Sequence, residues 1–376
     1  MRKILKVTAW FFVIACVVLF LLTYFSTDLF RQFGKTPEGE RLQRIQASPL
    51  YDGKALQNPS TFGSDAMGPM AAMLKEMLFG GEMRSPDAPV HADEFDARAF
   101  AARETSGVRF VWIGHSTILI EVDGFRILTD PIFSKRCSPT SLLGPVRFHD
   151  VKIPEEILRT VDVVLISHDH FDHLDLPSIK RFADMPARFV VPLGIGAHLE
   201  SWGIDAKRIH EREWWQSVSL WDGDLELICT PARHFSGRAI TRNQTLWASW
   251  VIRTGKRSLY FSGDTGYFEG FKEIGEKYGP FEFTMIEMAA YHEKFWPSVH
   301  MWPEQAVQAH LDLRGDVMMP IHWGTFNLAF HAWDEPAERL VAAAKSANVS
   351  LITPRPGQLV TLANVPAVNP WWRETQ

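Results

Sequence analysis

Short apolar runs separated by turn residues dominate the chain from residue 109 onward, a pattern typical of β-strands. The first three strands are predicted at Phe110–Ile113, Thr117–Val122 and Phe125–Leu128, the last two joined by a tight hairpin turn. A second hairpin is predicted from Leu246–Arg253 and Arg257–Phe261. Each hairpin leads into an acidic loop, at Asp130 and at Asp264, which indicates a degenerate internal duplication.

Helical and strand patterns alternate in the second half of the chain. Helices are predicted at Tyr267–Tyr278, Pro303–Leu313 and Pro336–Ser346. Further strands are predicted at Val161–Ser167, Leu225–Pro231, Phe281–Met288, Asp316–His322 and Ser350–Thr353. These elements favour an α/β architecture of two sheets flanked by helices.

The N-terminus has a different pattern, because no charged residue occurs from Val7 to Phe25. Nineteen helical residues reach ~28 Å, close to the ~30 Å hydrocarbon core of a bilayer. Arg2, Lys3 and Lys6 precede the run, so the positive-inside rule places the N-terminus in the cytoplasm. Residues 1–27 are therefore predicted to be an uncleaved single-pass anchor, with the catalytic domain on the extracytoplasmic (periplasmic) side. A cleaved signal peptide and lipoprotein processing at Cys16 are the alternatives.

Three further regions follow the anchor. Residues 28–105 form a connecting region, residues 106–364 a catalytic domain and residues 365–376 a C-terminal tail. The segment Ser64–Phe79 is a Met-rich amphipathic helix, which we expect to pack on the core rather than to face lipid or line a substrate site. In the tail, Pro370–Arg373 is expected either at a lipid headgroup layer or over an edge of the core.

Composition narrows the function. A formal net charge of -5 argues against a nucleic-acid binder, which would carry a basic surface. The three cysteines contain no Cys-x-x-Cys pair, which excludes a thiolate zinc knuckle. Cys137 and Cys229 are expected to be ordinary buried thiols, although a disulfide between them stays open.

The densest chemistry lies in the segment from His168 to His173, which holds three histidines and two aspartates in six positions. It follows a predicted buried strand, and imidazole and carboxylate ligands suit zinc, manganese or iron. His234, Asp264 and His322 also stand at the ends of apolar strands. Several strand ends at one sheet edge can converge, so the pattern predicts an open metal site with a reactive water.

The order of these residues resembles the metallo-β-lactamase superfamily and, within it, the N-acyl-phosphatidylethanolamine-hydrolysing phospholipase D family. The similar segments are Trp112–Ser116, Leu128–Phe133, Leu143–Phe148, Ser167–Asp175, Leu246–Trp250, Gly263–Tyr267, Ile274-Gly275, Tyr278–Phe281 and Ile321–Phe326. The resemblance implies an αββα sandwich of two mixed sheets. It also implies two divalent cations, with Zn²⁺ as the expected metal.

The resemblance further implies a role for each motif residue. His168, His170 and His234 would hold one metal, Asp172, His173 and His322 the second, and Asp264 would bridge the two. Asp172 would act either as a ligand or as a proton shuttle. His300 is expected to be a substrate-side residue or, equally, a residue of a helix start.

For other residues near these motifs, the sequence supports less specific roles. Asp175 would orient a ligand histidine or cap a helix, and His115 would support the site. We expect His292, His310 and His331 to be surface or packing residues. The chain departs from the family at Ala289–Tyr291 and at Met301-Trp302, so the metal centre is better supported than the lipid pocket.

The hypothesis from the sequence is a membrane-anchored dinuclear metal-dependent phosphodiesterase. Its reaction would be a phospholipase D-like hydrolysis of N-acyl-phosphatidylethanolamine or a related phospholipid, with the phospholipid and the membrane as partners. One alternative is a hydrolase of a soluble ester, lactone or cyclic phosphodiester. A second is a non-catalytic envelope protein with structural metals.

Overall fold

The structure is a computed structural model that describes residues 29–62, 68–80, 83–238 and 241–375. The predicted anchor, residues 7–25, lies outside these ranges and stays a prediction. Within the described part of the chain, none of the helices combines the length and the apolar character needed to cross a bilayer.

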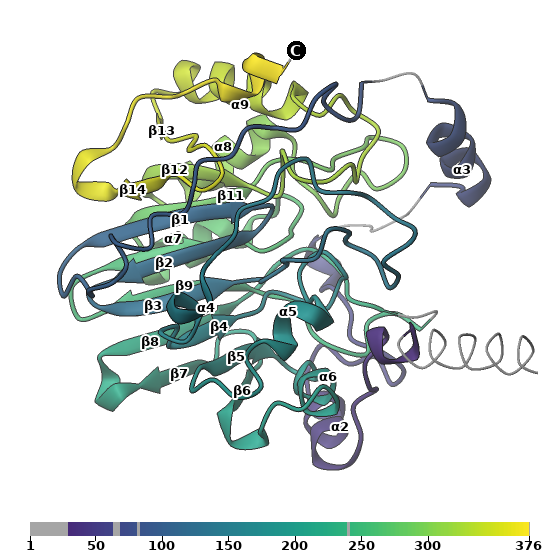
Figure 1. Cartoon of the computed structure of the whole chain (residues 1–376). Helices are drawn as coiled ribbons and strands as arrows, with labels where there is room; N and C mark the ends of the chain where they lie inside the picture. The colour runs from purple at the N-terminus through teal and green to yellow at the C-terminus, as the bar shows by residue number, and fades with distance from the viewer. Residues whose placement is uncertain (1–28, 63–67, 81–82, 239–240, 376) are drawn as a thin grey trace, which may run out of the picture.

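Two seven-stranded sheets form the centre of the molecule (Figure 1). The first sheet has the order β14 (Leu359–Thr361), β1 (Val108–Gly114), β2 (Thr117–Val122), β3 (Phe125–Thr129), β4 (Val163–Leu165), β5 (Arg188–Pro192) and β6 (Ile209–Arg212). The second has the order β13 (Ser350–Leu351), β12 (Gly315–Ile321), β11 (Phe281–Glu287), β10 (Ser258–Phe261), β9 (Ser249–Thr254), β8 (Leu225–Thr230) and β7 (Ser217–Leu220).

Both sheets are mixed and share one pairing pattern. In the first, neighbours from β14 to β3 are antiparallel and neighbours from β3 to β6 are parallel. In the second, neighbours from β7 to β10 are antiparallel and those from β10 to β13 are parallel. The prediction of two mixed sheets is therefore confirmed, and the shared topology supports the internal duplication inferred from the two hairpins.

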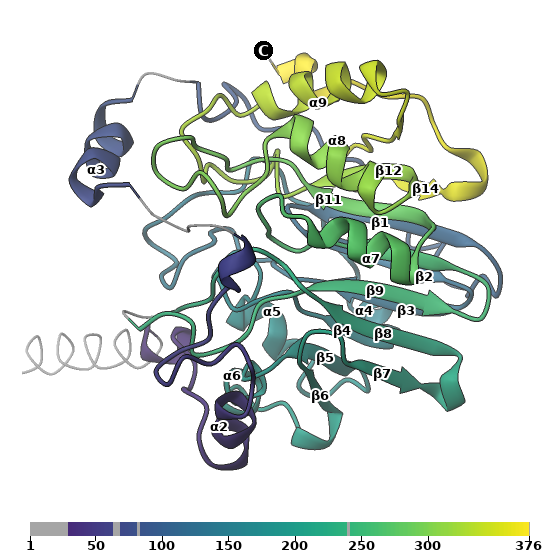
Figure 2. The ribbon, with the colours of Figure 1, turned by 180° about the vertical axis from the view of Figure 1, so that it is seen from behind.

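Helices cover the outer face of each sheet. Helices α4 (Glu155–Leu158) and α5 (Leu176–Lys180) lie over the first sheet in Figure 1, and α6 (Gly196–Ser201) lies beside them. Helices α7 (Gly270–Tyr278), α8 (Pro303–Asp312) and α9 (Glu335–Ser346) lie on the opposite side of the molecule, as Figure 2 shows. A short helix, α2 (Gly39–Gln46), packs near α6.

Aromatic rings fill much of the space between the sheets. Phe110 of β1 stacks on Phe283 of β11 with ring centroids 4.7 Å apart. At one end of this core, Trp371 lies 5.0 Å from Trp323, and both Trp371 and Trp372 are buried. The C-terminal tail therefore covers an edge of the core, and its expected position at a lipid headgroup layer is wrong for these two indoles.

Two other expectations about packing are also decided. Cys137 and Cys229 are free, buried thiols and do not form a disulfide. The Met-rich helix, α3 (Met70–Phe79), stands apart from both sheets in Figures 1 and 2, and its last residue, Phe79, is 78 % exposed. The expectation that this helix packs on the core is therefore wrong, because an apolar face at helical spacing does not specify which surface covers it.

Four strands were missed from the sequence, namely β5, β6, β7 and β14. Strand β6 is half-buried along its whole length, and β7 alternates exposed and buried positions over only four residues. Strands β6, β7 and β14 are short edge strands without a long apolar run, and for that reason pattern analysis does not detect them. Strand β5, by contrast, is an interior strand whose apolar residues from Phe189 to Pro192 do indicate a strand.

Close packing of α7 on the end of α8 depends on Gly275. A Cβ added there would lie 2.2 Å from the carbonyl oxygen of Asp312 and 2.9 Å from Cα of Leu313. Gly275→Ala is expected to lower the free energy of unfolding by about 1–3 kcal/mol, because backbone atoms must move to admit the methyl group. Urea denaturation measures this value.

The control is Gly255→Ala, in the turn between β9 and β10, where an added Cβ meets nothing within 4 Å. Its free energy of unfolding should stay within about 0.5 kcal/mol of the parent value. Equal stability of the two variants would contradict the packing argument.

Candidate metal centre

The ends of four strands bring the sequence-predicted residues together. The loop after β4 carries His168 to His173, and His234, Asp264 and His322 follow β8, β10 and β12. Side-chain donor atoms from these segments form adjoining clusters in which the atoms of each lie within 4.8 Å of one another. Parallel and hairpin strands that end at one edge of the sandwich thus bring together residues up to 154 positions apart in the chain, from His168 to His322.

The first cluster contains three histidines. His168 Nε2 lies 2.8 Å from His170 Nδ1, and His234 Nε2 lies 3.3 Å from the same His170 atom. The Oδ2 atom of Asp264 is 3.8 Å from His168 Nε2 and 3.7 Å from His234 Nε2. These four atoms surround a space suited to one cation.

The second cluster shares the same carboxylate oxygen. Asp264 Oδ2 lies 3.2 Å from His173 Nε2 and 3.0 Å from His322 Nε2. Asp172 Oδ2 lies 3.4 Å and 3.5 Å from these two nitrogens. One oxygen of Asp264 therefore faces both clusters, as a bridging ligand would.

Several atoms of the second cluster are buried without a hydrogen-bond partner among the described residues. They are His173 Nε2, both ring nitrogens of His322, and Asp264 Oδ1. Buried polar atoms in folded proteins are nearly always paired, so His173 Nε2 and His322 Nε2, which both face Asp264 Oδ2, need another partner. A set of imidazole nitrogens and carboxylate oxygens is the donor set that divalent transition metals prefer, and the cluster fits such ions.

The electrostatics of the centre agree with this fit. Burial holds the pKa of His168 and of His234 well below the ordinary value, which leaves both imidazoles neutral and able to bind a metal. Burial acts to raise the pKa of Asp264, but the adjoining His173 and His322 hold it well below its usual range. Despite burial, the Asp264 carboxylate raises the pKa of His322 to about 10. A metal ion would take over the positive charge that these protonated rings carry.

Asp130, at the end of β3, orients two of the cluster histidines. It accepts hydrogen bonds from the Ser167 backbone N (2.7 Å), from Ser167 Oγ (2.6 Å) and from His173 Nδ1 (2.7 Å). Ser167 Oγ in turn lies 2.9 Å from His168 Nδ1. Sequence reasoning missed this role, although Asp130 ends the first hairpin as Asp264 follows the second.

Asp175, which was expected either to orient a ligand histidine or to cap a helix, has the second of these roles. It caps α5 by accepting a hydrogen bond from the Ser178 backbone N at 3.2 Å, and Ser134 Oγ donates to it at 2.8 Å. Helix capping, one of its two expected roles, is therefore the one that the structure contains.

His115 contacts the second cluster directly. Its Nε2 lies 2.9 Å from Asp172 Oδ2, and its ring centroid is 4.1 Å from that of His322. Burial lowers the pKa of His115 to about 3, so the ring is neutral. Its position beside Asp172, His173 and His322 makes it a further candidate donor, which the sequence analysis treated only as support.

His300 lies beside the clusters and is oriented by a buried acid. Its Nδ1 is 2.9 Å from Glu287 Oε2, and its ring centroid lies 5.0 Å from that of His234 and 5.2 Å from that of His322. Trp302, rather than His300, occupies the N-cap of α8. Glu287 was missed, although it ends the apolar strand β11 as the other site residues end theirs.

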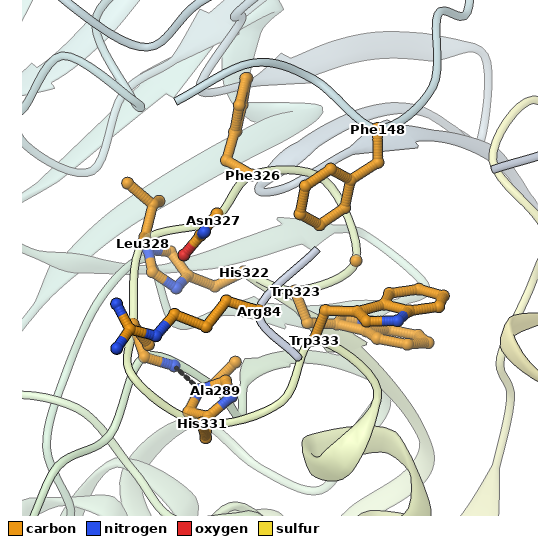
Figure 3. Close-up of a pocket in the computed structure, with 13 residues that line it drawn as sticks. Arg84, Phe148, Ala289, His322, Trp323, Phe326, Asn327, Leu328, His331 and Trp333 are labelled. Atoms are coloured by element: carbon orange, nitrogen blue, oxygen red, sulfur yellow. Dashed lines mark hydrogen bonds between the residues drawn. The ribbon is translucent and has the colours of Figure 1, made fainter. Parts of the chain in front are cut away.

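His292, His310 and His331 belong to none of the clusters. His310 is buried and bonds to Thr284 Oγ1, and His292 stacks on Phe295, so both pack as expected. His331 instead lines a narrow pocket of about 20 Å³ with His322 (Figure 3). Trp302, one of the departures from the family pattern, stacks on Tyr291 with ring centroids 4.3 Å apart.

A larger apolar groove adjoins this pocket. The two share Arg84, Phe148, Asn327, Leu328 and Ala329 as lining residues. The groove, about 880 Å³ in volume, continues to side chains that include Met73 of α3, Trp296 and Phe330. An elongated apolar ligand in the groove would thus have one end close to His322.

Arg238 ties the segment before α2 to the metal loop. It donates hydrogen bonds to the carbonyl oxygens of Asp169 and Leu174, both at 2.7 Å, and to that of Gln32 at 2.7 and 2.8 Å. Its guanidinium lies 4.1 Å from the centroid of the Phe171 ring. The loop that carries four candidate ligands is therefore held in place by a buried cation that pattern analysis did not detect.

Comparisons with known proteins agree with this geometry. Residues 125–323 match the family described as the beta-lactamase superfamily domain. An uncharacterised protein of Mycobacterium tuberculosis is 48 % identical over 72 % of this chain and 73 % of its own length. N-acyl-phosphatidylethanolamine-hydrolyzing phospholipase D 1 of Caenorhabditis elegans is 31 % identical over 78 % of this chain and 87 % of its own. A metallo hydrolase from Ignicoccus hospitalis, at 26 % identity, superposes with a TM-score of 0.54 over 68 % of this chain and 98 % of its own.

Loss of the Asp130 carboxylate should weaken metal binding without removing any candidate ligand. Asp130→Asn is expected to lower metal affinity by about 10–100-fold, because His173 and Ser167 lose the anion that orients them. Competition with a chromogenic chelator measures the affinity. The matched control is Asp175→Asn, which alters only the cap of α5 and should leave the affinity unchanged. An unaltered affinity in Asp130→Asn would contradict the orienting role.

Proposed function

Because this chain belongs to the beta-lactamase superfamily and is a metal-dependent hydrolase, we propose that its substrate is a phospholipid, N-acyl-phosphatidylethanolamine or a close relative. Hydrolysis at the distal phosphodiester bond would release an N-acylethanolamine-type alcohol and a phosphatidate. The similarity to the Caenorhabditis elegans phospholipase D supports this choice over the soluble ester, lactone or cyclic diester considered above.

One observation carries the proposal of a two-metal centre. Asp264 Oδ2 lies between 3.0 and 3.8 Å from four imidazole nitrogens that belong to two separate clusters. We assign His168, His170 and His234 to one metal, Asp172, His173 and His322 to the other, and Asp264 to both. Two divalent cations held there would supply an activated water and polarise a phosphoryl oxygen.

Two residues would handle protons and substrate oxygens around these ligands. Glu287 holds Nδ1 of His300, which leaves Nε2 of His300 as the ring atom able to meet a phosphoryl or leaving-group oxygen. Asp172 is fixed by His115 and lies against His322, which favours a ligand role over a mobile proton shuttle. His300 would therefore position the phosphodiester, and Asp172 would hold a metal.

The surroundings of the centre favour a lipid. The groove that adjoins the His322 pocket is lined by Met73, Trp296 and Phe330, which suit an acyl chain. Leu142 and Leu143, each 72 % exposed, directly precede Gly144, which also lines the groove. Exposed apolar side chains beside a groove are typical of a surface that enters a lipid layer. A membrane-anchored enzyme on the extracytoplasmic side would meet its substrate there.

Product analysis with labelled N-acyl-phosphatidylethanolamine tests the reaction. The metal-loaded protein should release N-acylethanolamine and phosphatidate, and EDTA treatment or His168→Ala should abolish the release by removing a metal or one of its ligands. The matched control is His91→Ala, an exposed histidine outside the clusters, which should retain full activity. Cleavage of soluble esters or diesters without cleavage of any phospholipid would replace this proposal with the alternative.

A second measurement tests the membrane surface. The double substitution Leu142→Ser, Leu143→Ser should lower hydrolysis in vesicles by about tenfold or more, because two apolar side chains no longer enter the lipid. Hydrolysis of a short-chain monomeric substrate should not change. Leu311→Ser removes an exposed leucine of α8 and serves as the control. Equal losses on vesicles and on monomers would indicate a folding defect and refute the surface assignment.

A further inference from the structure

We propose that a second pocket of this protein, formed by aromatic side chains and two carboxylates, binds a small organic cation with a quaternary or primary ammonium group. The pocket shares none of its lining residues with the candidate metal ligands. Its volume of about 370 Å³ falls in the range of small-molecule sites. The inference does not depend on the reaction proposed above.

Four aromatic rings wall this pocket, which we call the aromatic pocket. Phe62 stacks on Trp214 with ring centroids 6.0 Å apart and lies 4.4 Å from Phe268. Trp215 supplies the fourth ring. Leu50 and three prolines complete the apolar lining, and the prolines are Pro49, Pro59 and Pro231.

The charged residues that line the aromatic pocket are both acidic. Glu213 and Glu273 line it, and its lining residues include no lysine, arginine or histidine. Ser48 donates a hydrogen bond to Glu213, which fixes this carboxylate. An anionic ligand would be repelled, and a neutral ligand would gain no attraction from the two carboxylates. The faces of aromatic rings and carboxylates both attract an ammonium group.

The backbone at Trp215 supports a binding role. Trp214 and Trp215, in the turn between β6 and β7, both line the aromatic pocket. Trp215 achieves this with a φ of 70°, in the left-handed region that a bulky residue rarely adopts. Its backbone N donates to the Cys229 carbonyl oxygen at 2.7 Å, and Trp214 Nε1 donates to the Trp247 carbonyl oxygen at 2.7 Å. Strain of this kind is held mainly at ligand sites.

A lysine of the protein itself already makes a cation–π contact with Trp215. The ammonium nitrogen of Lys277 lies 4.4 Å from the centroid of the Trp215 ring, a cation–π contact. Lys277 and Glu273 both belong to α7, which lies on the outer face of the second sheet (Figure 2). The indole of Trp215 is therefore placed to accept an ammonium group, and the aromatic pocket offers space for one from solution.

Isothermal titration calorimetry of the full-length, metal-loaded protein tests the proposal. Choline and tetramethylammonium should bind saturably, with a dissociation constant of about 1 mM or below. The neutral isostere of choline, 3,3-dimethylbutan-1-ol, should bind at least about tenfold more weakly, because it lacks the charge that the carboxylates and rings attract. Absence of saturable choline binding, or equal binding of the neutral isostere, overturns the proposal.

Substitutions locate the binding. Trp215→Ala should weaken choline binding by about tenfold or more, and Glu273→Gln by a few-fold. The control Glu276→Gln removes an exposed carboxylate from the same helix outside the pocket and should bind choline as the parent does. If Trp215→Ala fails to fold, the comparison of Glu273→Gln with Glu276→Gln still tests whether choline binds in the aromatic pocket. Equal binding by those two variants overturns the assignment to the aromatic pocket.

Vesicles distinguish the two sources of such a cation. Selective binding to phosphatidylcholine over phosphatidylglycerol vesicles, reversed by free choline and weakened in Glu273→Gln, would identify a lipid headgroup as the ligand. Binding of free choline alone would identify a soluble amine, and either result supports the proposal. All these readouts are binding measurements, so their failure is separate from a failure to hydrolyse phospholipid.

Discussion

The buried negative charge of Asp264, surrounded by four imidazole rings, is the constraint on which the rest of the centre depends. A carboxylate taken out of water costs several kcal/mol unless a positive partner compensates it. Two of the rings are held protonated by this charge, and the other two are held neutral by burial. The side chains are therefore arranged for cations shared between two clusters, and the strands that present them must end at one edge to allow it.

Two equivalent hairpins each bring an acidic residue to this shared edge of the sandwich. The first ends at Asp130, which orients His173 and the start of the His168 loop, and the second leads into Asp264, which faces both clusters. In each half an antiparallel hairpin passes into parallel strands, so an acidic loop follows at the shared edge. The first half thus supplies the carboxylate that orients ligand histidines, and the second half supplies the carboxylate that faces both clusters.

Contacts around the centre link it to segments that are distant in the chain. Arg238 joins the metal loop to the backbone at Gln32, close to the predicted anchor. The apolar groove runs from the His322 pocket toward α3, which stands apart from the sheets. Arg238 thus links the segment that follows the predicted anchor to the metal loop, whereas the groove approaches the centre from the side of His322.

The sequence by itself determined the local structure and the chemistry of the ligands. Apolar runs predicted most strands within one or two residues, because this signal lies within a few neighbouring positions. The dense His/Asp segment at residues 168–173 and a His or Asp at three other strand ends indicated a metal site, and the family resemblance implied which seven residues are its ligands. Only the tertiary structure decided which acid orients which histidine. Asp130, Glu287, His115 and Arg238 act through contacts between segments 13 to 206 residues apart. It also decided that α3 stands apart from the two sheets and that Trp371 and Trp372 are buried in the core. An apolar face specifies that it must be covered, whereas its partner depends on how distant elements meet.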